Sequence, residues 1–273
     1  MKVSCLPVSL FSDITQGRIS LKDWAEAQER MGLDGIDVSM AFFHNHTPAY
    51  MRQTYEMLQK AGAQIVMAAA YPDFTHPAAL QREREAAYFI RDIALCSQLG
   101  IPYIRGLAGQ AHPGVTARDG IRWAVEGIRR CAEAADRMGV TMLYENHSKP
   151  SAWDYVDFSH PTGIFLAVAE GIRGTGVRIN FDTANTLVYG DDPLSVLAQI
   201  IDRVETVHVA DVQEKGKLSS VTIGTGAVPL REIFTMLKQH GFDGWLCIEE
   251  ASDRGFEGIR EAVRNVRTLW EQV

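Results

Sequence analysis

Four apolar runs of the sequence end in side chains that can bind a metal ion or transfer a proton. In the segment LYENH, residues 143–147, Glu145 and His147 lie two residues apart, so on a strand they point to the same side. Three later runs end in Asp182, His208 and Glu249. If the four strands share one sheet and one direction, Glu145 and these three residues meet in one site of mixed oxygen and nitrogen ligands.

Three carboxylates and one imidazole form a ligand set that suits a divalent ion. Among such ions we expect Mn²⁺ first, with Mg²⁺, Co²⁺ and Zn²⁺ as alternatives. The competing interpretation is structural, because acidic side chains at strand ends also cap the following helices and a single histidine often serves the core. The occurrence of all four at the ends of successive runs favours one divalent metal ion.

The runs that carry these residues belong to a regular alternation. Short apolar segments rich in Val and Ile alternate with longer helical patterns about eight times, without a linker or a low-complexity stretch. Eight consecutive βα units in roughly 250 residues are typical of a closed barrel. We therefore predict the α/β class and a single (β/α)8 TIM barrel as one domain over residues 1–273. A doubly wound open sheet is the alternative, but its glycine-rich turn is absent after the first strand.

The expected element boundaries follow from apolar spacing and from end signals. Ser20 can cap a helix that Gly32 ends, and Gly100 and Gly139 can end two longer helices. Strands are expected over residues 2–7, 35–38, 64–69, 102–105 and 140–145, and in runs that end at 182, near 210 and at 249. Helices are expected over residues 21–31, 48–61, 75–99, 116–138, 193–201, 229–240 and 255–271. The aromatic-rich loop 148–160 is expected to be an ordered wall or lid.

Charge and composition argue against several classes of protein. The net charge of −7, from 34 acidic and 27 basic residues, gives no basic surface for nucleic acid or for an anionic membrane. No apolar run reaches the roughly 20 residues of a membrane span, and the N-terminus lacks the pattern of a signal peptide. We therefore expect a cytoplasmic protein. Four separate cysteines in apolar patterns are expected to be buried free thiols: Cys5, Cys96, Cys131 and Cys247.

These motifs resemble those of the xylose isomerase-like TIM-barrel superfamily. Within it, the chain is similar to the sugar phosphate isomerase/epimerase group, which includes ketose 3-epimerases, inosose isomerase and dehydratase, and hydroxypyruvate isomerase. The resemblance covers nearly the whole chain and rests on LYENH, NFDTAN, VHVADV, IGTG at residues 223–226, and GWLCIEE. It implies that one divalent metal ion is held by Glu145, Asp182, His208 and Glu249, with Glu249 preferred over the adjacent Glu250.

The resemblance implies a reaction on a small ketose, keto-polyol or related polyhydroxy carbonyl compound. A divalent ion on the substrate oxygens lowers the pKa of the neighbouring C–H group and stabilises the enediolate that forms when the proton leaves. In the ketose 3-epimerases, the glutamates that match Glu145 and Glu249 remove and return this proton. We therefore expect a metal-dependent sugar isomerase or epimerase in which Glu145 and Glu249 are catalytic.

His147 raises a second possibility. A neutral imidazole beside Glu145 can act as a catalytic general base or bind the substrate. Related dehydratases and lyases use such a base on keto-polyols or 3-keto-glycosides, so a metal-dependent dehydratase or lyase is the alternative. A remote alternative is a DNA repair enzyme resembling endonuclease IV, which shares the barrel but needs a three-metal cluster, extra histidines and a basic surface.

Three further residues are substrate-binding candidates. Arg105 ends the fourth strand and can bind a substrate oxygen or form a salt bridge. Asn185 can bind substrate or cap the next helix, and Asp211 can orient a ligand or a base. The IGTG turn can hold a phosphate, although such glycine turns are common.

The remaining candidates near the expected site are weaker. They are charged or polar loop residues and rim histidines: Lys149, Gln213, Lys215, His44, His46, His76 and His112. The expected partners are a small sugar or polyol substrate and further copies of the chain, in a homodimer or homotetramer.

Overall fold

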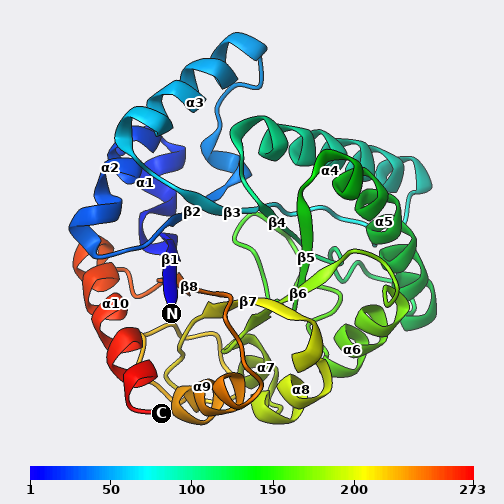
Figure 1. Ribbon diagram of the computed structural model, residues 1–273. Helices are drawn as coiled ribbons and strands as arrows, with labels where there is room; N and C mark the ends of the chain where they lie inside the picture. The colour runs from blue at the N-terminus through cyan, green and yellow to red at the C-terminus, as the bar shows by residue number, and fades with distance from the viewer.

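The protein folds into a nearly closed barrel of eight parallel strands surrounded by helices (Figure 1). The computed structural model describes residues 1–273. Hydrogen bonds join the strands in the order β1-β8-β7-β6-β5-β4-β3-β2. The predicted α/β class and single TIM barrel are confirmed. The strands are β1 (Lys2–Leu6), β2 (Ile36–Ser39), β3 (Ile65–Ala69), β4 (Tyr103–Gly106), β5 (Thr141–Glu145), β6 (Arg178–Asp182), β7 (Val204–Val209) and β8 (Trp245–Glu249).

The seam between β1 and β2 is joined mainly through Asp34, which precedes β2. The backbone N–H groups of Asp34 and Gly35 donate to the carbonyl oxygen of Val3 at 2.8 and 3.3 Å. Val3 in turn donates its N–H to the Asp34 carboxylate at 2.8 Å. The Ser4 hydroxyl donates to the Asp37 carboxylate across the same seam at 2.7 Å. Side chains therefore replace part of the strand ladder where the barrel closes.

Helices connect the strands and cover the outside of the barrel (Figure 1). They are α1 (Phe11–Thr15), α2 (Leu21–Met31), α3 (Pro48–Ala61), α4 (Ala79–Leu99), α5 (Ala117–Met138), α6 (Thr162–Gly171), α7 (Asn185–Tyr189), α8 (Pro193–Ile200), α9 (Leu230–Gln239) and α10 (Gly255–Glu271). Short 3-10 helices are η1 (Val8–Leu10), η2 (Met40–Phe42) and η3 (Ile201–Arg203). None of the helices has both the length and the apolar character that crossing a membrane requires.

Side chains and glycines set several helix ends as predicted. The Ser20 hydroxyl caps α2 by accepting the N–H of Asp23 at 3.1 Å. Gly32 ends α2 with a φ of 71°. Gly100 and Gly139 end α4 and α5 in the same left-handed conformation. Glycine is favoured at these positions because a Cβ atom is strained at such a φ.

Two aspects of the predicted helices were wrong. α4 begins at Ala79 rather than at residue 75, because the preceding residues are bonded elsewhere. The Thr75 hydroxyl donates to the carbonyl of Gln110 at 2.8 Å, and His76 Nδ1 accepts the N–H of Ala78 at 3.0 Å. In addition, α1, α6 and α7 were not predicted. α6 is apolar without interruption over residues 164–169, and α1 and α7 have only 5 residues each, so none of the three shows helical spacing.

The strand side chains contribute to two separate apolar clusters. A core of 66 buried residues lies mainly between the strands and the helices. Leu143 and Cys247 belong to a second, smaller cluster. Because side chains alternate along a strand, Glu145 and Glu249, two residues further on, point to the same interior side. All four cysteines are buried and free, as predicted.

Candidate metal centre

The C-terminal ends of β5, β6 and β8, with the later part of β7, bring four metal-binding side chains together. One ligand atom from each lies within 4.8 Å of the others. Asp182 and His208 are paired neighbours in the register of β6 and β7. Glu145 pairs instead with Asn180, and this stagger is expected for tilted strands of a barrel. The four side chains that the sequence proposed as ligands therefore lie in one cluster: Glu145, Asp182, His208 and Glu249.

Glu145 lies on the buried side of this cluster. Its Oε2 atom lies 2.7 Å from Arg105 Nε, and its Oε1 atom lies 3.0 Å from His208 Nδ1. The same His208 nitrogen lies 3.9 Å from Glu249 Oε2. The side chains of Glu145, Arg105 and His208 have no exposed surface, whereas 16% of the Glu249 side chain is exposed. Glu249 is therefore the glutamate of this pair that reaches solvent.

Crowded charges shift the pKa values of these groups in opposite directions. Burial alone would raise the pKa of Glu145, but the charges of His208 and Arg105 hold it below its usual value. Burial and the charges of Glu249 and Glu145 raise the pKa of Asp182 well above its usual value. Burial opposes protonation of His208, but Glu145 and Glu249 raise its pKa to about 9. The protein thus concentrates acidic groups that attract protons or another cation.

The donor set fits a divalent cation. Asp182 Oδ1 accepts the N–H groups of Ala184 and Asn185 at 2.8 and 2.7 Å, whereas its buried Oδ2 atom has no hydrogen-bond partner. A buried carboxylate oxygen without a partner is costly, and a bound cation removes that cost. Carboxylates with one imidazole are compatible with Mn²⁺, Mg²⁺, Co²⁺ and Zn²⁺.

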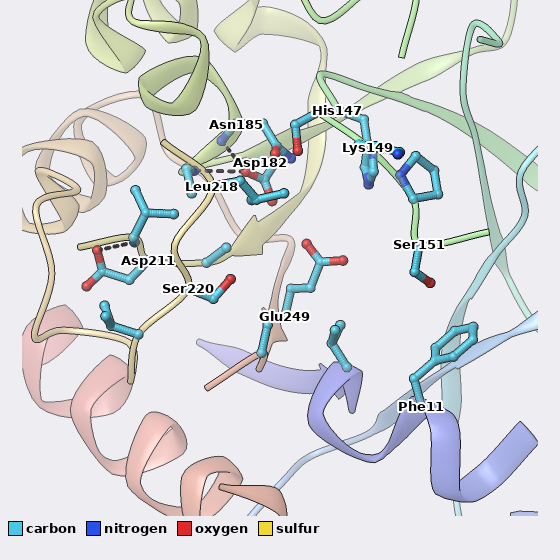
Figure 2. A pocket seen from close by; sticks show the side chains of 18 of the residues that line it. Phe11, His147, Lys149, Ser151, Asp182, Asn185, Asp211, Leu218, Ser220 and Glu249 are labelled. Carbon is cyan, nitrogen blue, oxygen red and sulfur yellow. Dashed lines mark hydrogen bonds between the residues drawn. The ribbon is translucent and has the colours of Figure 1, made fainter. Parts of the chain in front are cut away.

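The cluster opens into a cavity of about 580 Å³ at the mouth of the barrel (Figure 2). Asp182 and Glu249 line this cavity, whereas Glu145 does not. Residues 147–151, which follow β5, form one side, and the segment that contains residues 218, 220 and 221 forms the other. A cavity of this size can enclose a small molecule above the metal-binding side chains.

His147 lines the cavity two residues after Glu145. The residue is largely buried, and its Nδ1 atom has no hydrogen-bond partner. Burial lowers the pKa of His147 to about 3, helped by the charges of Arg105 and His208 and opposed by that of Glu145. A neutral imidazole at the edge of the cavity can accept a hydrogen bond or a proton.

Two of the predicted substrate-binding residues differ in their access to the cavity. Asn185 lines it and also begins α7. Arg105 does not line it and is fully buried, with its guanidinium against Glu145, the carbonyl of Ala70 and the ring of Tyr71. Of the two roles considered for Arg105, the structure shows the salt bridge.

Asp211 lies at the cavity edge, but its carboxylate is bound by backbone groups. It accepts the N–H groups of Val212, Gly224, Gly226 and Val228 at 2.9, 3.0, 2.8 and 3.1 Å. The amides of the IGTG turn therefore point at a carboxylate of the protein itself. The phosphate-binding interpretation of this turn is not supported, and Asp211 serves to shape the loop that follows β7.

The rim histidines considered as substrate contacts do not line the cavity: His44, His46, His76 and His112. His112 Nε2 lies 2.7 Å from Asp73 Oδ2, and its ring packs against that of His76 with centroids 4.8 Å apart. The contacts of His112 with Asp73 and His76 connect the loops after β3 and β4.

Several residues of the cavity wall gave no signal in the sequence. Phe11 follows β1, and Leu218 and Ser220 lie between β7 and the IGTG turn. Apolar and hydroxyl residues in loops follow no periodic pattern, so only the folding of separate loops to one rim brings them together. The rule that barrel sites lie after the strands could have drawn attention to the segment after β1.

A family model described as Xylose isomerase-like TIM barrel matches residues 25–269. Because this match covers most of the chain, the protein belongs to the xylose isomerase-like TIM-barrel family. The resemblance that the sequence motifs suggested is confirmed.

The curated relatives carry two kinds of enzyme name. A Streptomyces coelicolor protein provisionally named hydroxypyruvate isomerase is 31% identical over 155 residues, which are 55% of this chain and 53% of the relative. An inosose dehydratase of Clostridium tetani is 28% identical over 144 residues, which are 47% of this chain and 46% of the relative. The chain thus spans about half the length of the curated relatives it matches.

Solved structures share the whole fold at low sequence identity. The crystal structure of IOLI protein with a bound zinc atom has a TM-score of 0.80 and 16% identity. The comparison covers 100% of this chain and 99% of that chain. At this identity the likeness shows a common fold.

Proposed function

We propose that this protein is a divalent-metal-dependent isomerase or epimerase of a small polyhydroxy carbonyl compound, such as a ketose or a keto-polyol. The observation that carries the proposal is the cluster of one imidazole and three carboxylates that opens into a cavity. Membership of the family supports it, as does the isomerase name of one curated relative.

A bound divalent ion would supply Lewis acidity, which makes the C–H group next to a substrate carbonyl more acidic. The residues that would hold it are Glu145, Asp182, His208 and Glu249. We favour Mn²⁺, and the zinc atom in the structure of IOLI protein makes Zn²⁺ the main alternative.

Proton transfer is the task that we assign to the two glutamates. Glu249 has exposed surface on the cavity, so we assign it the removal of the proton from the bound substrate. We assign the return of the proton to Glu145. Its contacts with Arg105 and His208 fix the orientation of its carboxylate. His147 and Asn185 line the cavity and would hydrogen-bond substrate hydroxyl groups.

Solvent exchange tests the proposed reaction. The Mn²⁺-loaded protein is incubated in deuterated buffer with ketoses, inososes and 3-keto-glycosides, and NMR and mass spectrometry follow exchange and water loss. The expected result is deuterium incorporation next to the carbonyl without elimination. Glu249→Gln should lower exchange by about 10²–10⁴-fold, the usual contribution of a general base. Glu145→Gln should lower formation of the isomerised or epimerised product by a similar factor.

Metal content and thermal unfolding of both variants are measured alongside exchange. These controls separate a lost proton-transfer group from a lost metal or a damaged fold. Nearly wild-type exchange in Glu249→Gln together with nearly wild-type product formation in Glu145→Gln contradicts the two-glutamate mechanism.

A metal-dependent dehydratase or lyase acting on a keto-polyol or a 3-keto-glycoside is the second candidate. His147 favours it, because its unpartnered Nδ1 atom lies in a side chain that lines the cavity. A curated relative also carries the name inosose dehydratase. In this function His147 takes the proton next to the carbonyl, a C=C bond forms, and the β substituent leaves as an anion that water protonates. Water loss that His147→Asn abolishes would favour this candidate.

The endonuclease IV-like alternative finds no support in the described site. Its chemistry was expected to need three metal ions and extra histidines, whereas one cluster of metal-binding side chains is present. The net charge of −7 is also unsuited to DNA. A cytoplasmic location and a homodimer or homotetramer stay predictions.

A further inference from the structure

One basic side chain stands on the cavity wall without an acidic partner. Lys149 forms no ion pair or hydrogen bond with the protein, whereas Lys217, beside the opposite wall, pairs with Glu214 at 2.9 Å. Figure 2 shows Lys149 across the cavity from Leu218. The formally charged residues that line the cavity are Lys149, Asp182, Asp211 and Glu249.

The backbone on both sides of Lys149 is anchored, although the side chain is exposed. Ser148 and Pro150 are buried. The carbonyl of Ser148 accepts the N–H of Asp157 at 2.6 Å. A proline also restricts the residue before it to an extended conformation. Lys149 is therefore held at the rim by its neighbours.

The other charged side chains leave an anion few favourable places on the wall. Asp182 and Glu249 carry acidic groups toward the cavity, and Arg105 is buried against Glu145. An anionic group at the rim meets the ammonium group of Lys149 instead. A charge-assisted hydrogen bond is stronger than one between neutral groups, and a partly enclosed cavity strengthens it further.

We propose that Lys149 binds an anionic group of the substrate, a carboxylate or a phosphate, while the carbonyl end of the substrate lies over the metal-binding side chains. This inference rests on the proposed function, because it names the class of substrate for the same cavity. The substrate is then an acidic sugar, a polyhydroxy keto acid or a sugar phosphate. Ser151, on the same wall, offers a hydroxyl donor to the same group.

Three polyols with the same carbon chain test the inference: D-glucitol, D-gluconate and D-glucitol 6-phosphate. Isothermal titration calorimetry measures their Kd values for the Mn²⁺-loaded and the metal-free protein. We expect wild-type protein to bind at least one anion about 10–100-fold more tightly than D-glucitol. Preference for D-gluconate identifies a carboxylate, and preference for D-glucitol 6-phosphate identifies a phosphate.

Variants assign this preference to Lys149. Lys149→Met should abolish it and leave the Kd of D-glucitol unchanged, whereas Lys149→Arg should retain it. Lys215→Met is the matched control, since Lys215 is an exposed lysine outside the cavity lining. Thermal unfolding checks that each variant folds.

Several outcomes overturn the inference. They are equal binding or no binding of the three polyols by wild-type protein, a preference that survives in Lys149→Met, and an equal loss in Lys215→Met. If the anion preference survives in Lys149→Met only when the protein is loaded with Mn²⁺, the anion binds the metal and not Lys149. Failure of the exchange assay with an intact Lys149-dependent preference would instead overturn the proposed reaction and retain the anion site.

Discussion

Arg105 and Glu145 form an ion pair without contact with solvent. Neither side chain has exposed surface, and Arg105 Nε lies 2.7 Å from Glu145 Oε2. The guanidinium also packs over the ring of Tyr71 at 4.8 Å. Such a pair adds little stability compared with apolar residues, but loss of one partner leaves a buried charge uncompensated.

Arg105→Met should therefore lower the free energy of unfolding of the metal-free protein by about 3–5 kcal/mol. The double variant Arg105→Met/Glu145→Gln should recover much of this loss, because neither charge remains. Urea unfolding of wild type, both single variants and the double variant gives the coupling energy. Additive effects of the two substitutions would show that the pair is not coupled in solution.

The loop after β7 is an element whose shape depends on one carboxylate and one glycine. Asp211 accepts N–H groups from four backbone positions of this loop and so holds it against the end of the strand. Gly226 approaches so closely that a Cβ atom there would overlap Asp211 Oδ1 and the carbonyl of Val212. Lack of space, and not a left-handed backbone, requires glycine here, because the φ of Gly226 is not positive.

Gly226→Ala should lower the free energy of unfolding by about 1–3 kcal/mol, the usual cost of forcing extra volume into a packed site. Gly163→Ala in α6 is the matched control, because a Cβ atom there has no neighbour within 4 Å. The control should be neutral or slightly stabilising, since alanine favours a helix. Urea unfolding compares the two variants, and equal stabilities would contradict the proposed crowding.

At the level of elements, local signals predicted strands better than loops. β5, β6 and β8 end at the residues that their apolar runs indicated. The start of α4 was predicted too early, because the contact between Thr75 and Gln110 joins two loops and leaves no local pattern. α6 was missed because an apolar run over residues 164–169 lacks the polar face that marks helical spacing.

At the scale of the whole molecule, the candidate metal site joins separate βα units. Its four side chains come from β5, β6, β7 and β8, half of the barrel. A cation bound to all four would bind the folded protein and have no comparable site in the unfolded chain. Binding of this kind stabilises the fold by mass action.

Removal of divalent ions with EDTA should therefore lower Tm, and Mn²⁺ or Zn²⁺ should restore it. At a free metal concentration 100 times Kd, binding adds about 2.7 kcal/mol, which corresponds to roughly 5–10 °C for a domain of this size. Differential scanning fluorimetry measures the shift. Asp182→Asn should reduce it, and Lys149→Met should leave it unchanged. A Tm independent of metal for the wild-type protein would contradict the metal site.

The sequence by itself determined the barrel and the set of residues that meet in the cluster. Alternation along a strand and the glycine that ends a helix are local properties, so they are readable without the fold. Glu145 and Glu249 each lie two residues after an inward-pointing residue of their strand. Gly32 and Gly139 end helices as predicted. The family resemblance rested on the same local motifs.

Only the tertiary structure decided which charged side chains are available to a ligand. In the sequence, Arg105, Asp211 and Lys149 are alike in being charged residues near strand ends. In the fold, Arg105 is bound to Glu145 and Asp211 to the backbone of the IGTG turn, whereas Lys149 has no partner. These pairings depend on contacts between segments far apart in the chain. Local spacing carries no information about such contacts.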